Sequence, residues 1–245
     1  MSFTRRWRIL LLLPILAVSF CLFLIGANYY YAQRARHLLE RIRAMPLDNS
    51  AIAELKRLGS EHGFRYEEAH DCDKTPCIHF VAPNNLWMQY LLTSRITAKV
   101  GRALGLRAWL AVGDIEIEGQ KVVGKIYGLA FFEGRYDPSI QVTAWEKRNF
   151  DLTPCSYPPV KRHPGYGFRN ASNIRSFTAV VSSDTSTENR GRAFQFNLRC
   201  LTSWHECDQF SQLMPTAWAD HEEDGNWLEA HPSHLVWKVG EKCPY

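Results

Sequence analysis

The chain of 245 residues lacks the short motifs that identify several large classes of enzyme. It contains no Gly-x-Ser-x-Gly sequence, no phosphate-binding glycine loop and no dinucleotide-binding fingerprint. The sequence therefore has no signature for the nucleophile of a serine hydrolase. It also has none for a backbone loop that binds the phosphates of a nucleotide. Internal repeats and low-complexity tracts are also missing. We accordingly expect no cofactor and no repeat architecture.

Most of the chain has no net positive charge. The net charge of +4 arises near the N-terminus, whereas residues 66–245 hold 19 Lys/Arg and 21 Asp/Glu, a net charge of −2. A nucleic-acid-binding domain needs a basic face on the domain itself. The charge distribution therefore argues against nucleic acid as a partner, and it fits a basic segment beside anionic lipid headgroups.

A long apolar run occurs at the N-terminus. Residues 9–27 carry no charge, and 19 residues of helix span roughly the ~30 Å hydrocarbon core of a bilayer. Three arginines precede the run, and Tyr29–Tyr31 follow it where an interfacial aromatic belt would lie. Because Ile25 occupies the −3 position before Ala27, a small-x-small cleavage site is missing. We therefore expect an uncleaved signal anchor that makes this a single-pass membrane protein.

The cysteines indicate on which side of the membrane the rest of the chain lies. Cys21 falls within the anchor, and the other six are in the soluble part. An even number in short-spaced pairs is typical of oxidised domains outside the cytoplasm, whereas reduced, buried cysteines in a cytosolic domain are the alternative. We expect a cytoplasmic N-terminus and a periplasmic or extracellular domain. Because short loops close readily, we predict three disulfides: Cys72–Cys77, Cys200–Cys207 and, by elimination, Cys155–Cys243.

Four segments follow from these features. We expect a cytoplasmic tail at 1–8, the anchor at 9–27, a helical juxtamembrane stalk at 28–45 and an extracytoplasmic globular domain at 46–245. Pro46 ends the stalk, because proline removes a helical hydrogen bond and clashes with the preceding turn. Since residues 46–245 contain every predicted strand, we expect that segment to fold without the anchor.

The pattern of apolar residues predicts an α+β fold. Alternation of apolar and polar residues predicts strands at 64–68, 77–81, 115–118, 121–132, 140–144, 174–181 and 193–200. Residues 150–170 are expected to form a loop, and residues 206–245 to be irregular apart from a short helix at 208–213. We therefore expect N-terminal helices packed on a mainly antiparallel sheet with three disulfides.

Potential metal ligands are densest near the C-terminus, at His221, Glu222, Asp224, His231 and His234. A divalent-metal site is one interpretation of this group. The residues do not form His-Glu-x-x-His, and Pro232 directly after His231 breaks a helix, so ligands spaced along one helical face are not expected. The favoured interpretation is a solvated acidic loop.

Asp71-Cys72-Asp73 forms an Asp-x-Asp sequence. In membrane-anchored glycosyltransferases, such a pair holds the metal that neutralises a nucleotide diphosphate, and their order of tail, anchor, stalk and luminal domain is similar. The motif is short, and an acidic turn around a disulfide explains the same residues. We therefore keep a glycosyltransferase-like enzyme as an alternative.

One stretch resembles a known group of proteins. It comprises residues 196–202, Cys207 and residues 213–218, preceded by the Cys72/Cys77 turn after a helix. This pattern is similar to the C-terminal region of a group of bacterial single-pass membrane-anchored proteins with a disulfide-containing extracytoplasmic domain. The resemblance implies a bacterial source and a periplasmic or surface location, and it implies no activity.

Two functions remain in view from the sequence. The first is a non-catalytic module that binds or scaffolds another component of the cell envelope, either a protein or a polymer. The second is an envelope enzyme, namely a metal-dependent hydrolase acting through His221–His234 or a glycosyltransferase-like protein acting through Asp71 and Asp73. Since no catalytic constellation stands out, the sequence favours the first.

Overall fold

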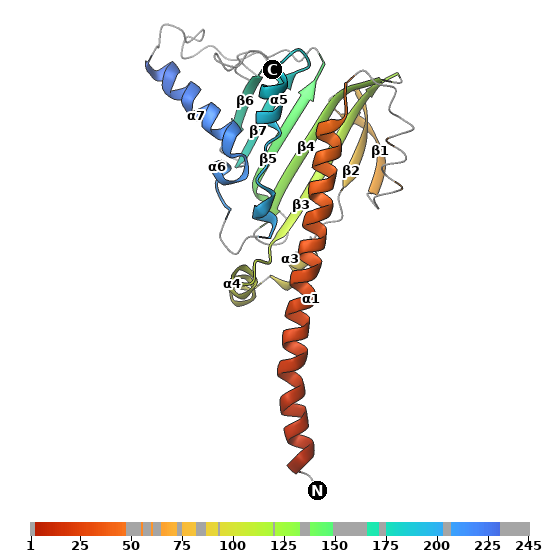
Figure 1. Ribbon diagram of the computed structural model, residues 1–245, viewed down its shortest axis with the longest axis vertical. Helices are drawn as coiled ribbons and strands as arrows, with labels where there is room; N and C mark the ends of the chain where they lie inside the picture. The colour runs from red at the N-terminus through yellow and green to blue at the C-terminus, as the bar shows by residue number, and fades with distance from the viewer. Residues whose placement is uncertain are drawn as a thin grey trace.

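The protein consists of one long helix and an α+β domain built on a seven-stranded sheet (Figure 1). The structure is a computed structural model. It describes residues 3–47, 55, 60, 65–72, 75–81, 87–92, 94–119, 121–132, 138–148, 166–171, 175–202 and 207–230.

The long helix, α1, covers Phe3–Ala44 and extends far beyond the sheet at its N-terminal end (Figure 1). It is long and apolar enough to cross a membrane. Pro14 lies inside the helix, as membrane helices tolerate. The large apolar side chains described up to Phe23 are mostly exposed. A helix that is apolar on every face needs an apolar surrounding, which agrees with a membrane anchor.

The second half of α1 belongs to the core of the domain. One face is buried, at Ala32, Ala35, Leu38, Leu39, Ile42 and Met45. These residues follow the i, i+3, i+4 spacing of one helical face, and they share a single apolar cluster with the sheet. The segment predicted as a stalk therefore lies against the domain that follows it.

The sheet has the order β1-β2-β3-β4-β5-β7-β6. Its strands are β1 (Arg65–Cys72), β2 (Thr75–Val81), β3 (Ala108–Glu118), β4 (Lys121–Phe132), β5 (Pro138–Lys147), β6 (Tyr166–Ala171) and β7 (Ser176–Ser182). All neighbours pair antiparallel except β5 and β7, which are parallel. The α+β class is confirmed, and the sheet is mixed.

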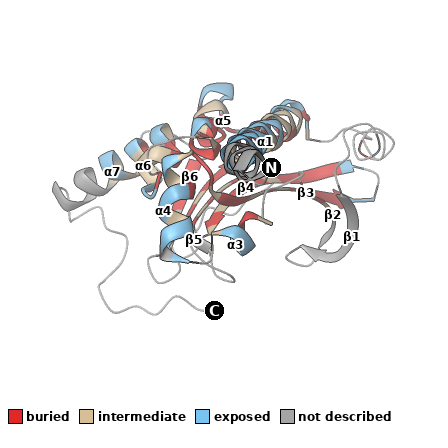
Figure 2. Ribbon diagram, turned by 90° about the horizontal axis from the view of Figure 1, so that it is seen from below, coloured by how far each residue is buried: buried red, intermediate tan, exposed pale blue. Residues whose placement is uncertain are grey.

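Short helices complete the described fold. They are α3 (Met88–Leu91), α4 (Arg95–Ala103), α5 (Thr187–Ala193), the 3-10 turn η2 (Leu198–Leu201), α6 (Phe210–Leu213) and α7 (Pro215–Ala230). Helices α1, α5, α6 and α7 lie over one face of the sheet, whereas α3 and α4 flank α1 where it leaves the domain (Figures 1 and 2). We call the face beneath α1 the first face and the opposite one the second face.

Three predictions of local structure were wrong. Instead of a strand at 193–200, α5 ends at Ala193, residues 194–197 are irregular and η2 begins at Leu198. Strand β6 covers the last residues of the predicted loop at 150–170, and α7 replaces much of the segment predicted to be irregular after residue 213. Pro215 begins α7, which is a favourable place for proline because the first N–H groups of a helix have no helical partner. Helix α4 had no counterpart in the prediction.

One of the predicted disulfides is confirmed. Cys200 and Cys207 are bonded, with their Cα atoms 5.7 Å apart. Cys21 carries no disulfide. The side chains of the other four cysteines lie outside the described residues, and the pairs Cys72–Cys77 and Cys155–Cys243 stay predictions.

Candidate functional site

The C-terminal end of α1 is held by a lysine from the sheet. Lys125 lies on β4, and its Nζ donates to the carbonyl oxygen of Arg43 at 3.1 Å and to that of Met45 at 2.6 Å. The last carbonyl groups of a helix have no partner within the helix, and the helix dipole favours a cation there. Lys125 therefore caps α1 from another element.

Lys125 forms a cluster of charged side chains with Glu146 and Arg190, which we call the Lys125 cluster. Glu146 faces Lys125 across the β4–β5 ladder, and its Oε2 lies 3.1 Å from the Lys125 Nζ. Its Oε1 lies 2.7 Å from the Nε of Arg190 on α5. Burial lowers the pKa of Lys125, and the charge of Glu146 opposes this shift. The cluster joins α1, the sheet and α5.

A buried asparagine fixes α1 near the other end of the domain. Asn28 donates from Nδ2 to the carbonyl oxygens of Gly105 at 3.1 Å and Leu201 at 3.0 Å. Its Oδ1 accepts a hydrogen bond from the Nε1 of Trp109 at 3.1 Å. One side chain thus connects α1 to the residues after α4, to β3 and to η2.

We expect Asn28→Leu to destabilise the domain by about 3 kcal/mol, because it leaves the Trp109 indole N–H and two carbonyl groups without their partner. The measurement is urea denaturation of the full chain in mild detergent, followed by far-ultraviolet circular dichroism. Trp109→Phe removes one of the same hydrogen bonds, so the two substitutions together should cost less than the sum of their separate effects. Strict additivity would contradict the assigned contact.

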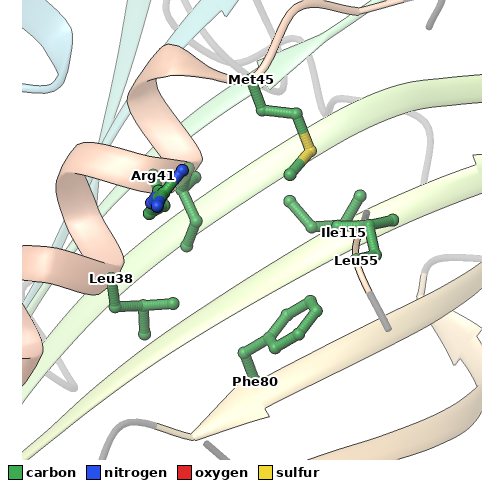
Figure 3. Close-up of a pocket in the computed structure, with 7 residues that line it drawn as sticks. Leu38, Arg41, Met45, Leu55, Phe80 and Ile115 are labelled. Atoms are coloured by element: carbon green, nitrogen blue, oxygen red, sulfur yellow. The ribbon is translucent and has the colours of Figure 1, made fainter. Parts of the chain in front are cut away.

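A small apolar pocket lies where α1 crosses β2 and β3 (Figure 3). It is lined by Leu38, Arg41, Ile42, Met45, Leu55, Phe80 and Ile115. Among the described residues that line the pocket, Arg41 is the charged one, and none is acidic or nucleophilic. The apolar part of this lining packs the end of α1 against the sheet.

The second face of the sheet carries titratable side chains at its middle. His79 on β2 and Asp114 on β3 face each other in register and form an ion pair when the imidazole is protonated. Glu116 is fully buried and lies 3.0 Å from the Nζ of Lys147. The two residues sit on either side of Gly124 on β4. A side chain at Gly124 would meet the Glu116 carboxylate, whose Cδ lies 2.9 Å from the position of an added Cβ.

Aromatic and polar groups extend this face over β5 and β7. Trp145 is half-buried, and the Nζ of Lys147 lies over its ring, 5.3 Å from the centroid. Thr143 and Thr178 are adjacent across the parallel β5–β7 pair and are also half-buried. The described part of the second face therefore combines a partly exposed aromatic ring, paired charges and hydroxyl groups.

The structure describes only some of the candidate metal ligands near the C-terminus. His221, Glu222 and Asp224 lie on α7, so the predicted acidic loop is a helix. His231 and His234 lie outside the described residues. Within the described part of the chain, no three His, Cys, Asp or Glu side chains gather in a group that could hold a metal.

His221 packs among aromatic rings of the first face. Its ring centroid lies 5.6 Å from Phe168, 5.6 Å from Phe177 and 5.0 Å from Trp218, on which it stacks. Burial lowers the pKa of His221 from its ordinary value of 6.5, with smaller opposing effects of Glu222 and Asp224. The surroundings of the ring favour its neutral form.

This environment predicts a pH dependence of stability. Because the folded-state pKa of His221 is lowered, its contribution is present above the unfolded-state pKa of about 6.5 and is lost as the pH falls from there through the folded-state pKa. We expect His221→Phe to remove this acid-dependent decrease in the free energy of unfolding. Denaturation curves of the full chain in detergent between neutral and acidic pH test it; an unchanged slope in the variant would contradict the assignment.

The motif proposed for a glycosyltransferase lies mostly outside the residues that the structure describes. Asp71 lies on β1, but its side chain and all of Asp73 are outside the described residues. The acidic motif therefore has no described geometry, and it stays a prediction.

The residues that bind α1 to the sheet were not predicted from the sequence. Lys125 and Glu146 interrupt otherwise apolar core-facing positions on β4 and β5, and charged residues are rarely buried unless they are paired. A charged residue at a core-facing position was therefore the signal in the sequence that could have indicated a buried ion pair. Asn28 gave no comparable signal, because an isolated polar residue beside an aromatic belt also suits a membrane boundary.

Comparisons with protein-family models, curated proteins and solved structures find no match for this chain. The resemblance to bacterial membrane-anchored proteins therefore stays a prediction. Function has to be inferred from the arrangement of this chain's own residues.

Proposed function

We propose that the protein is a non-catalytic, membrane-anchored module of the cell envelope whose extracytoplasmic domain binds or scaffolds another envelope component, either a protein or a polymer. The observation that carries the proposal is that α1 is continuous from its membrane-compatible half into the core of the domain. Such a helix fixes the orientation of the sheet relative to the bilayer. A fixed orientation suits a module that presents one face of its sheet to a neighbouring envelope component.

The fastening of α1 supports this proposal. The Lys125 cluster holds the end of the helix, Asn28 holds it near the bilayer, and Tyr127 donates from its hydroxyl to the Ala35 carbonyl at 3.1 Å between them. In each of these contacts, a buried polar side chain fixes the position of α1 relative to the sheet. The Cys200–Cys207 disulfide supports an oxidising compartment for the domain.

The second face of the sheet is the surface that we assign to the partner. It lies opposite the helices of the first face (Figure 2), and partly exposed Trp145 provides the type of side chain that often anchors a protein interface. The neighbouring His79–Asp114 and Lys147–Glu116 pairs give this surface fixed polar groups. A protein partner or a polymer with polar groups fits this combination.

Photo-crosslinking in native membranes tests the proposed function. A benzophenone amino acid replaces Trp145 in one variant and Trp218, on the opposite side of the sheet, in the control. We expect a defined adduct with an envelope component from position 145 and none from position 218. Failure to form that adduct at position 145 would contradict the proposed partner surface. Stoichiometric metal in the purified protein would instead favour the metal-dependent enzyme.

A further inference from the structure

Exposed apolar side chains outside α1 are concentrated on α3 and α4. Among the side chains that the structure describes, the large exposed apolar residues lie on α1 up to Tyr30 or on these two short helices. On α3 they are Tyr90, which is 70% exposed, and Leu91; on α4 they are Ile96, which is 76% exposed, and Val100. A soluble surface rarely gathers such residues without a binding partner.

Helix α4 turns its apolar side outward. Ile96 and Val100 are four residues apart and therefore share one exposed face, whereas Gly101 is buried against Leu92. The helix is well defined at both ends, by a capping box between Ser94 and Thr97 and by Gly105 at φ +69° just after it. Its apolar side is thus a stable surface of the fold, facing away from the core.

The two helices lie at the level where α1 leaves the domain. Leu24 and Ile25 of α1 pack with Met88 of α3 and with Leu104 and Leu106 just after α4. The side chains of Leu22 and Phe23, directly before this contact, are exposed on α1. The apolar surface of α3 and α4 is therefore continuous with the lipid-compatible surface of α1. Figure 1 shows α4 nearly end-on beside α1, so α4 runs across the direction of the long helix.

The charge of this segment complements an anionic surface. Residues 82–113 contain four basic residues and no acidic one. Lys99 is exposed on α4, and Arg102 and Arg107 are half-buried. A helix with an apolar face and a basic flank is typical of segments that lie in the headgroup region of a membrane with anionic lipids.

We propose that α3 and α4 insert their apolar side chains into the headgroup region of an anionic phospholipid bilayer beside α1, and so hold the domain against the membrane surface. This inference rests on the proposed membrane anchoring by α1. In this arrangement α1 spans the bilayer, and α3 and α4 contact the surface of the same bilayer. Both contacts together hold the domain.

Lipid-phase quenching tests the proposal in the full chain. The environment-sensitive fluorophore NBD is attached to a single introduced cysteine, in a Cys21→Ser background, at Ile96, at Phe23 on α1 or at Glu223 on α7. The protein is reconstituted in vesicles of phosphatidylcholine and phosphatidylglycerol that contain nitroxide-labelled lipid. We expect strong loss of fluorescence at positions 23 and 96, little loss at exposed position 223, and weaker loss at position 96 with Lys99→Glu or in phosphatidylcholine alone.

The three positions separate the possible failures. Quenching at position 23 without quenching at position 96 would overturn surface docking while leaving the anchor intact. Quenching at neither position would overturn the membrane anchoring itself, on which the proposed function also depends. Equal quenching at position 96 with and without phosphatidylglycerol would overturn the role of anionic lipid. If position 96 crosslinked to a second copy of the chain and its fluorescence were not quenched by lipid, the surface would be assigned to self-association instead.

Discussion

A chain that begins at residue 46 is expected to remain largely unfolded, although residues 46–245 contain all seven strands. Removing α1 takes four large apolar side chains out of the core, namely Leu38, Leu39, Ile42 and Met45. At roughly 1.5–3 kcal/mol for each buried side chain, the loss is about 6–12 kcal/mol, which is comparable with the whole stability of a typical domain. The structure thus argues against the expectation, drawn from the sequence, that this segment folds alone.

A chain of residues 28–245 is the matched control. It keeps the buried face of α1 from Ala32 and the hydrogen bonds of Asn28, and it lacks the whole apolar run of residues 9–27. We expect cooperative thermal unfolding and dispersed amide resonances from residues 28–245, and neither from residues 46–245, when both are prepared under oxidising conditions. Cooperative unfolding of the shorter chain would show that α1 is dispensable for the fold.

Replacing Lys125 by methionine is expected to destabilise the domain by about 3–5 kcal/mol, because it leaves buried Glu146 with one cation fewer and uncaps the end of α1. Urea denaturation of the full chain in mild detergent measures this effect. Lys121→Met is the matched control: it makes the same change at an exposed position on the same strand and should alter the free energy of unfolding by less than about 0.5 kcal/mol.

A second substitution shows whether the charge of Glu146 is responsible. Lys125→Met with Glu146→Leu removes both members of the buried pair, and Arg190 is about 29% exposed and can reach water. We therefore expect the double variant to recover part of the stability lost in Lys125→Met. If Lys125→Met proved as mild as Lys121→Met, the assigned capping of α1 would be wrong.

Local signals in the sequence predicted the centre of the sheet well. Alternation around Ile115 and Ile117, a glycine turn and a second apolar strand indicated the β3–β4 hairpin. The structure places that turn at Gly119, whose φ of +64° suits glycine. These signals depend on residues near one another in the chain, so they were available without knowledge of the tertiary fold.

Residues 194–200 show why a correct burial pattern can give a wrong element. Phe194, Phe196, Leu198 and Cys200 are buried as the alternation predicted. However, the backbone N–H of Asn197 donates to the Leu213 carbonyl at 2.8 Å, and its side chain donates to the Gln212 carbonyl at 2.9 Å. These residues are held by the segment before α7 instead of by a neighbouring strand, and such partners cannot be read from periodicity.

The contacts that hold α1 against the sheet could not be predicted from the sequence for a related reason. The pairing of Lys125 with Glu146 depends on the β4–β5 register, and the contact of Asn28 with Trp109 joins residues 81 positions apart. Helix α4 had no counterpart in the prediction, and its large apolar residues Ile96 and Val100 face outward, whereas amphipathic patterns are normally interpreted as packing against a core. The anchor was predicted, because a long apolar run needs no tertiary partner.

The continuity of α1 from membrane to core is tested most directly by amide hydrogen exchange of the full chain in lipid nanodiscs. The account predicts that the amides of residues 34–44 exchange as slowly as those of β4, since both belong to the same buried cluster and open together with the domain. Fast exchange over residues 34–44, with β4 still protected, would mean that this part of α1 is a separate stalk and would contradict the account.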